Sequence, residues 1–290
     1  MKYLLLLLIP LISVSLCTQF PDIFSIPLVP EVASLGTGSQ DIFISVESPS
    51  SQISAGMAAQ VYFQLANMQN YSLSNVRLEV YDNSCFSDGI SVKSDCGAGG
   101  TLRKNETCTW SWRWASSPSP IDRTCTVRYK VSYSASNSIL QDIAVMSESE
   151  YQSRGGVGSL QGIVLSATPA KGPLNYYLTF SEAQPFIGGR SGYTMYVNYE
   201  NRGDGYFDDL TGDITLLPPS TMTIYDCKDY TGNVLNKNPV FIRGKALRSE
   251  CFFSTSDVSA LSISAMEVRA EYTYNLYKTF TILVKGSRLS

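Results

Sequence analysis

Apolar and polar residues alternate with a period of two along most of the chain, and this pattern predicts β-strands rather than helices. Residues 61–65 place Val61, Phe63 and Leu65 on one face. Residues 76–81 alternate more sharply, with Arg77, Glu79 and Tyr81 opposite the apolar side chains. Strands with one dry and one wet face are typical of antiparallel sheets that pack as a sandwich. We therefore expect an all-β fold.

Further strands with the same alternation are expected throughout the chain, over residues 108–114, 125–131, 193–197, 221–225, 268–272 and 280–284. Short clusters of turn-forming residues separate them, at 54–56, 97–100 and 117–120. A glycine-rich break at 154–158 divides the strands into two sets.

The two sets of strands are similar enough to predict a divergent repeat. Each has an early strand that ends in asparagine, at 65–67 and at 198–201. Each later has a short charged stretch before a cysteine and an aromatic strand, at 104–110 and at 248–253. We expect two tandem sandwiches, over residues 41–150 and 174–290, with residues 151–173 as the linker.

The first seventeen residues have the features of a secretory signal peptide. One lysine precedes an apolar run over 4–16, which Pro10 interrupts and which is too short to span a membrane as a helix. Cleavage is expected between Ser15 and Thr18. Lipidation of Cys17 is the alternative, and it is disfavoured because Leu16 stands where a lipobox has a small residue. We expect the protein to be secreted or at the cell surface, held to a membrane only by an N-terminal anchor if the segment is uncleaved or lipidated.

Residues 18–40 are expected to form an N-terminal spacer or arm. Apolar side chains are frequent over residues 20–32, but Pro21, Pro27 and Pro30 prevent a regular central strand. A spacer that covers its own domain is favoured. The alternative is an arm that joins a neighbouring subunit by strand addition, as in a filament.

Composition restricts the chemistry. The chain has 290 residues with a net charge of −3 and only 16% charged residues, which argues against a nucleic-acid partner. Histidine is absent, so Ser–His–Asp catalysis, Cys–His catalysis and histidine-bound zinc are excluded. No Ser-x-x-Lys or Gly-x-Ser-x-Gly motif occurs. We expect no cofactor and no enzymatic activity.

Six cysteines follow the signal region, and an even number in an exported chain is typical of disulfides. They are Cys85, Cys96, Cys108, Cys125, Cys227 and Cys251. Sequons for N-glycosylation begin at Asn70 and Asn105 and agree with export.

Several segments resemble a known family. Residues 63–67, 73–81 and 100–102, and in the second set 197–204, resemble immunoglobulin-like adhesion modules of the CARDB type in their strand pattern and their Asn and Gly turns. Such modules occur in surface proteins of archaea and some bacteria, including adhesive and S-layer-associated chains. The resemblance implies two tandem immunoglobulin-like antiparallel sandwiches at a cell surface.

In an immunoglobulin-like sandwich, the strand that ends near Tyr81 runs antiparallel to the one that starts near Cys125. This arrangement favours the pairs Cys85–Cys125 and Cys96–Cys108, and the second repeat then supplies Cys227–Cys251. Three pairings are possible for the first four cysteines, and Cys85–Cys96 with Cys108–Cys125 is the second choice.

Two groups of side chains are candidate ligand sites. Trp110, Trp112 and Trp114 share one face and could stack on sugars, although a place in the core is favoured because the residues between them are polar. Asp204, Asp208, Asp209 and Asp213 could bind Ca²⁺, although their spacing is not that of an EF-hand and a solvated turn is favoured.

The leading functional hypothesis is an exported cell-envelope or adhesion-type structural protein, whose partners are an envelope protein, a glycan or further copies of itself. The alternatives are a carbohydrate-binding surface protein and a filament subunit assembled through residues 20–32.

Overall fold

A computed structural model describes residues 42–48, 51–83, 85–87, 90–94, 96, 100–155 and 164–287. The predicted signal peptide, its cleavage region and the predicted arm over 20–32 lie outside these residues. These described residues all belong to one compact unit by their contacts, and the description below is of that unit alone.

The first sheet has four antiparallel strands in the order β1-β3-β6-β5. These strands are β1 (Ile42–Glu47), β3 (Ala58–Asn67), β6 (Thr107–Ala115) and β5 (Ile90–Ser94). In β3 the apolar residues at alternate positions, such as Phe63 and Leu65, are buried, as the period of two predicts.

A second sheet is built from the C-terminal part of the chain, in the order β14-β19-β11-β18-β17, and β9 also pairs with β11. The strands are β9 (Leu174–Phe180), β11 (Ser191–Asn201), β14 (Met222–Cys227), β17 (Phe241–Ile242), β18 (Lys245–Ala246) and β19 (Ser249–Thr255). All of these pairs are antiparallel.

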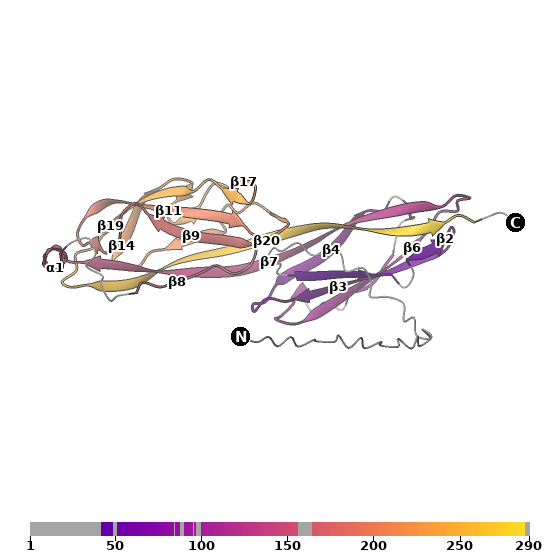
Figure 1. Ribbon diagram of the computed structural model, residues 1–290, viewed down its shortest axis with the longest axis horizontal. Coiled ribbons are helices and arrows are strands. Elements are labelled where there is room, and N and C mark those ends of the chain that lie inside the picture. The colour runs from indigo at the N-terminus through magenta and orange to yellow at the C-terminus, as the bar shows by residue number, and fades with distance from the viewer. Residues whose placement is uncertain are drawn as a thin grey trace, which may run out of the picture. The chain divides into compact units, whose positions relative to one another are not determined.

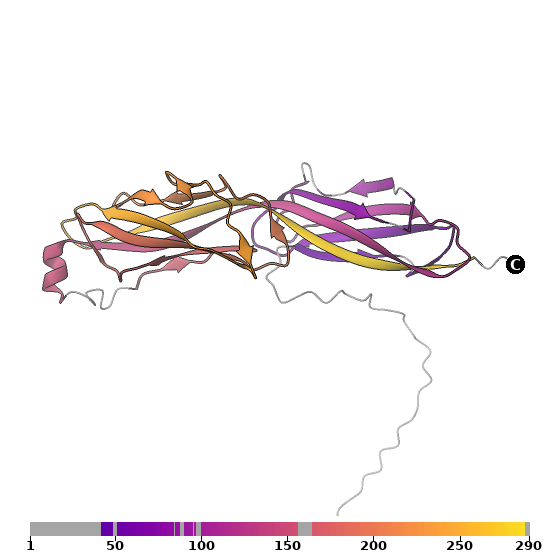
Figure 2. The same ribbon diagram turned by 90° about the horizontal axis from the view of Figure 1, so that it is seen from above.

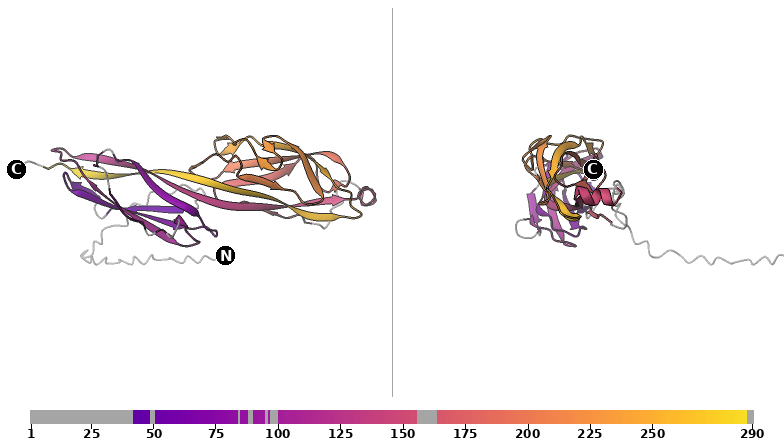
Figure 3. Two further views of the ribbon diagram at one scale, coloured as in Figure 1. Left: turned by 180° about the vertical axis from the view of Figure 1, so that it is seen from behind. Right: turned by 90° about the vertical axis from the view of Figure 1, so that its left-hand side faces the viewer.

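The third sheet is organised by two strands of 24 residues each, β7 (Arg123–Met146) and β20 (Ser262–Lys285). They pair antiparallel without a break from Arg123 opposite Val284 to Val145 opposite Ser262, and Figure 1 and Figure 3 show them side by side along their length. Eight shorter strands complete this sheet: β2 (Gln52–Ser54), β4 (Ser74–Asp82), β8 (Ala167–Thr168), β10 (Phe186–Ile187), β12 (Tyr206–Phe207), β13 (Ile214–Leu217), β15 (Tyr230–Thr231) and β16 (Val234–Leu235).

The described residues contain one short helix, α1 (Glu148–Ser153), which follows the end of β7 (Figure 2). Ser147 caps it, since its side chain accepts a hydrogen bond from the amide of Glu150. Within the part of the chain that the structure describes, no helix has the length and apolar character needed to cross a membrane.

Both smaller sheets pack on the third sheet. The ring of Phe63 in β3 lies 5.0 Å from that of Tyr129 in β7 and 5.7 Å from that of Phe280 in β20. In the C-terminal part, the Tyr176 hydroxyl of β9 donates a hydrogen bond of 2.9 Å to the carbonyl of Asn137 in β7. The prediction of an all-β sandwich fold is confirmed.

The number of domains is not confirmed by this arrangement. The predicted division into residues 41–150 and 174–290 stays a prediction, because β20 belongs to the second segment and pairs with β7 of the first over its whole length. Its last residues also pair with β2.

Buried tyrosines make the fold sensitive to alkaline pH. Burial raises the pKa of both Tyr129 and Tyr199 to about 12. A phenol whose pKa is raised by folding stabilises the protein fully below pH 10, the value for the unfolded chain, and this stabilisation is lost as the pH rises toward 12. We expect the free energy of unfolding to fall over this range and to fall less in Tyr129→Phe, which urea titrations at pH 9, 10, 11 and 12 will measure. An equal fall in the variant would contradict the role of Tyr129.

Candidate functional site

Three exposed tyrosines form an aromatic patch on the third sheet, which we call the tyrosine surface. Tyr81, Tyr206 and Tyr277 keep 49%, 68% and 50% of their area exposed. The ring centroid of Tyr277 lies 6.1 Å from that of Tyr81 and 6.1 Å from that of Tyr206, and both pairs meet edge to face. Large side chains that remain in contact with one another at an exposed surface are typical of binding sites.

The strand register brings these tyrosines together from three separate elements. Tyr277 of β20 is opposite Lys130 of β7, and Tyr206 of β12 is opposite Asn275 of β20. The pairing of β4 with β7 shifts between Val80 and Asp82, so Tyr81 is the extra residue of a bulge. A bulge reorients the side chain that it carries, and here the Tyr81 ring contacts the ring of Tyr277 across β7.

Charged side chains lie beside the rings. Glu79, Lys130 and Tyr277 are neighbours on adjacent strands. The Lys130 ammonium donates to the Glu79 carboxylate at 2.9 Å, and this hydrogen bond is the main cause that raises the pKa of Lys130. At the Tyr206 end, the Asn275 amide donates to Asp208 at 2.8 Å.

The tyrosine surface therefore combines flat apolar rings with carboxylate and ammonium groups at one sheet face. Tyrosine rings offer apolar contact area with little loss of conformational entropy, since the side chain has few rotatable bonds. The neighbouring Glu79 and Asp208 can accept hydrogen bonds from hydroxyl groups. Such a surface suits a ligand with both apolar C–H faces and many hydroxyls.

The three tryptophans lie elsewhere. Trp110 and Trp114 are buried, with 7% and 1% of their area exposed, and Trp112 is half-buried. Trp112 packs edge to face on Phe63 at 5.4 Å, and Trp114 stacks on Phe86 at 5.8 Å. These side chains belong to the core between the first and third sheets, and they present no aromatic platform.

The four aspartates proposed as calcium ligands have separate partners. Asp204 lies 3.8 Å from the Lys278 ammonium, and Asp208 accepts the hydrogen bond from Asn275. Asp209 accepts a hydrogen bond of 2.9 Å from the amide of Thr211. Burial, with the charges of Glu271 and Asp209, raises the pKa of Asp213. Among the described residues, no three Asp, Glu, Cys or His side chains are grouped so that they could hold a metal ion.

The six cysteines form three disulfides, Cys85–Cys125, Cys96–Cys108 and Cys227–Cys251. These are the three pairs that the sequence analysis favoured.

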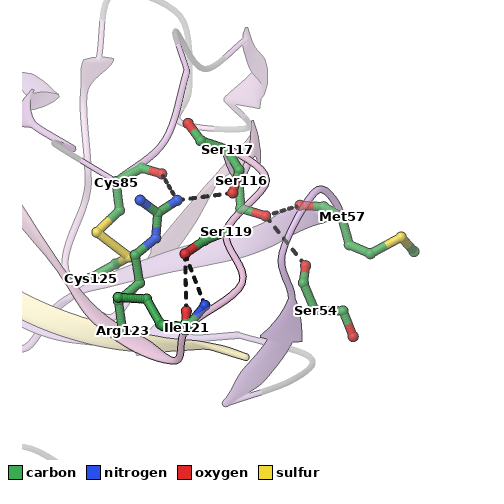
Figure 4. Close-up of a disulfide and its surroundings, with 9 residues drawn as sticks. All are labelled: Ser54, Met57, Cys85, Ser116, Ser117, Ser119, Ile121, Arg123 and Cys125. Carbon is green, nitrogen blue, oxygen red and sulfur yellow. Dashed lines mark hydrogen bonds between the residues drawn. A yellow bond between two sulfur atoms is a disulfide. The ribbon is translucent and has the colours of Figure 1, made fainter. Parts of the chain in front are cut away.

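Figure 4 shows the first disulfide beside a hydrogen-bonded loop. The Arg123 guanidinium donates to the carbonyls of Cys85 and Ser117, at 3.5 Å and 3.0 Å. The buried Ser116 hydroxyl donates to the carbonyl of Met57 at 2.9 Å. The disulfide holds the start of β7 to the loop after β4, the Arg123–Ser117 bond holds it to the segment after β6, and the Ser116–Met57 bond holds that segment to the turn before β3.

Both sequons lie at the surface. Asn70 and Asn105 are exposed, and Asn105 adopts a left-handed backbone conformation, with a φ of 59°, in the turn before β6. A glycosyltransferase could therefore reach either side chain in the folded chain.

Sequence reasoning found only part of the tyrosine surface. The alternation over 76–81 placed Tyr81 on the wet face of its strand. Nothing local connects it with Tyr206 or Tyr277, which lie more than a hundred residues further along the chain.

Comparison with known proteins does not assign the chain to a family. No protein-family model and no curated protein matches the chain, so the resemblance to CARDB-type modules stays a prediction. Solved structures that match include the secreted serine protease VesC from Vibrio cholerae, with a TM-score of 0.23 and 11% identity over 80% of this chain and 50% of that chain. The C-terminal domain of the AgI/II polypeptide BspA from Streptococcus agalactiae matches with a TM-score of 0.15 and 8% identity over 81% of this chain and 94% of that chain. Our chain thus spans half of the VesC chain, and likeness at this level carries no functional argument.

The expectation that the chain lacks enzymatic activity is not upheld, since a secreted serine protease is among the matching structures. A TM-score of 0.23 does not show an activity for this chain either. The expectation was drawn from missing motifs, which exclude particular mechanisms and not catalysis as a whole. Because the chain contains no histidine, a Ser–His–Asp triad cannot be formed from its residues alone.

Proposed function

We propose that this protein is an exported, adhesion-type protein of the cell surface that binds glycans through the tyrosine surface. The observation that carries the proposal is the contact of Tyr81, Tyr206 and Tyr277 with one another while each stays about half exposed or more. Buried aromatic rings would be explained by packing in the hydrophobic core, and single exposed rings are common on protein surfaces. A contacting, exposed set offers one continuous area to a partner.

The groups around the rings favour a glycan over an apolar ligand. A sugar presents C–H groups on the faces of its ring and hydroxyls around its edge. Tyr277 and its neighbours can contact the faces, while Glu79 and Asp208 lie where they could accept hydrogen bonds from hydroxyls. An apolar ligand would have no hydroxyl groups to donate hydrogen bonds to these carboxylates.

Three disulfides support the exported location, because such bonds form and persist in oxidising compartments. The exposed sequons and the expected signal peptide agree with it. The resemblance to CARDB-type modules supports a role at a surface, where adhesion to glycans is a common task.

A glycan array with the purified protein tests the proposal. We expect one or a few related glycans to bind, and we expect Tyr277→Ala to weaken that binding about tenfold or more, because Tyr277 contacts both other rings. Tyr81→Ala and Tyr206→Ala each remove a ring at one end of the tyrosine surface and should weaken glycan binding less than Tyr277→Ala.

The matched control is Tyr225→Ala, which removes a tyrosine that is 56% exposed on β14. It should leave glycan binding unchanged. Binding that survives all three substitutions on the tyrosine surface, or that Tyr225→Ala weakens equally, would refute the proposal.

A further inference from the structure

A second surface feature lies on the hairpin formed by β17 and β18. Three of the most exposed apolar side chains in the described residues are close together in sequence here: Val240, Ile242 and Leu247 are 72%, 70% and 88% exposed. We call residues 236–248 the basic hairpin. Single exposed apolar residues are normal, but a group of three on one short element indicates a contact with another phase or molecule.

The strand register gives the hairpin two different faces. Ile242 is opposite Lys245, and Phe241 is opposite Ala246. Opposite residues of an antiparallel pair point to the same side of the ribbon. Phe241 packs inward, with its ring 5.3 Å from that of Phe207, so Ile242 and Lys245 point outward. Val240 and Leu247 continue the outward alternation, as their exposure shows.

The turn holds this hairpin in a defined position. Arg243 and Gly244 both have positive φ, of 52° and 80°, as in the two-residue turn that suits the twist of a hairpin. The amide of Asn201 in β11 donates a hydrogen bond of 2.7 Å to the carbonyl of Gly244. The outward side chains are therefore presented by a fixed element of the second sheet.

The charge of the hairpin is opposite to that of the whole chain. Residues 236–248 contain Lys237, Arg243, Lys245 and Arg248 and no Asp or Glu, while the chain has a net charge of −3. Lys237 lies 3.7 Å from Asp229, and Lys245 lies 4.0 Å from Glu200.

Both arginines of the basic hairpin keep their charge available. Arg243 and Arg248 form no ion pair among the described residues. The Arg248 guanidinium lies over the ring of Tyr196, 3.8 Å from its centroid. A ring contact orients a guanidinium without neutralising its charge.

We propose that the basic hairpin docks on the surface of an anionic lipid bilayer, with Ile242 and Leu247 entering the acyl boundary and Arg243 and Arg248 at the phosphate level. Outward apolar side chains flanked by cations have the composition of elements that lie in a membrane interface. The charge complementarity selects anionic over neutral lipid. An acidic peptide or polysaccharide would use the cations but would leave the protruding aliphatic side chains without a partner. This docking is separate from glycan binding, because the tyrosine surface is formed by other strands.

Sedimentation with vesicles tests the proposal, using phosphatidylcholine vesicles with and without 30% phosphatidylglycerol. We expect the native protein to sediment with the anionic vesicles and not with the neutral ones. Arg243→Gln with Arg248→Gln should lower the partition coefficient by about fivefold per charge removed. Ile242→Ser with Leu247→Ser should lower it by about tenfold or more.

The control variant is Arg113→Gln with Ile121→Ser, which removes an exposed arginine and an apolar residue that is 68% exposed outside the hairpin. It should bind as the native protein does. Equal sedimentation with both kinds of vesicle, or equal loss in the control, would overturn the proposal.

Two further outcomes would also overturn it by identifying another occupant. Binding to soluble polyglutamate that does not depend on Ile242 and Leu247 would indicate an acidic polymer. A concentration-dependent dimer that the hairpin substitutions abolish, in the absence of vesicles, would indicate a second copy of the chain. None of these results depends on whether the tyrosine surface binds a glycan.

Discussion

A fragment that ends at residue 150 is expected to stay unfolded when it is expressed alone, although it contains every residue of the first predicted sandwich. Residues 123–131 of β7 pair with β20 from Leu276 to Val284. The fragment would lose that partner and leave the backbone groups on one side of β7 unpaired. An unpaired central strand also exposes an edge that promotes aggregation.

The fragment would also lose part of its core. The ring of Phe280 in β20 contacts those of Phe63, Trp114 and Tyr129. Val284 and Ile282 are buried on the same strand. No other strand in the described residues of the fragment occupies the position of β20.

Circular dichroism, amide exchange and urea unfolding of the fragment over 41–150 measure this effect. The matched control carries residues 272–287 at its C-terminus, joined through a flexible Gly-Ser linker, and is expected to fold. Cooperative unfolding of the fragment without that segment would contradict the expectation and would support two independent domains.

Replacement of Trp114 by alanine is expected to destabilise the protein by about 3–5 kcal/mol, the usual cost of removing a buried aromatic side chain. Trp114 is 1% exposed and lies between Phe86, at 5.8 Å, and Phe280, at 6.4 Å. The substitution opens a cavity at the contact of the first sheet with the third, where the surrounding strands are paired and can relax little.

Chemical denaturation of the disulfide-intact protein measures this loss. Trp112→Ala is the control, since Trp112 is only half-buried and should cost clearly less. A loss below about 1 kcal/mol for Trp114→Ala, or a larger loss for Trp112→Ala, would show that Trp114 is not part of the core.

The sequence by itself determined the class of fold and the partition of most side chains. In β3, β4 and β6 the period of two assigned Phe63, Leu78 and Trp114 to the dry face, and each is buried. This information is local, because neighbouring side chains of a strand point to opposite faces whatever the strand pairs with. The favoured disulfide pairs also agree with the structure, and Cys227 and Cys251 are opposite each other on the adjacent strands β14 and β19.

Only the tertiary structure decided which strands share a sheet, and therefore where the candidate sites lie. The pairing of β7 with β20 joins residues more than a hundred positions apart, and the sequence of neither strand identifies the strand with which it pairs. Tyr81, Tyr206 and Tyr277 become one surface only through that pairing and through the bulge in β4. The outward position of Ile242 and Leu247 likewise depends on Phe241 packing against Phe207. Alternation along a strand fixes the face on which each side chain lies. The neighbours of that side chain come from other strands, which are often far away in the sequence. Many different strand pairings satisfy the same alternation, so the sequence pattern alone does not select one of them.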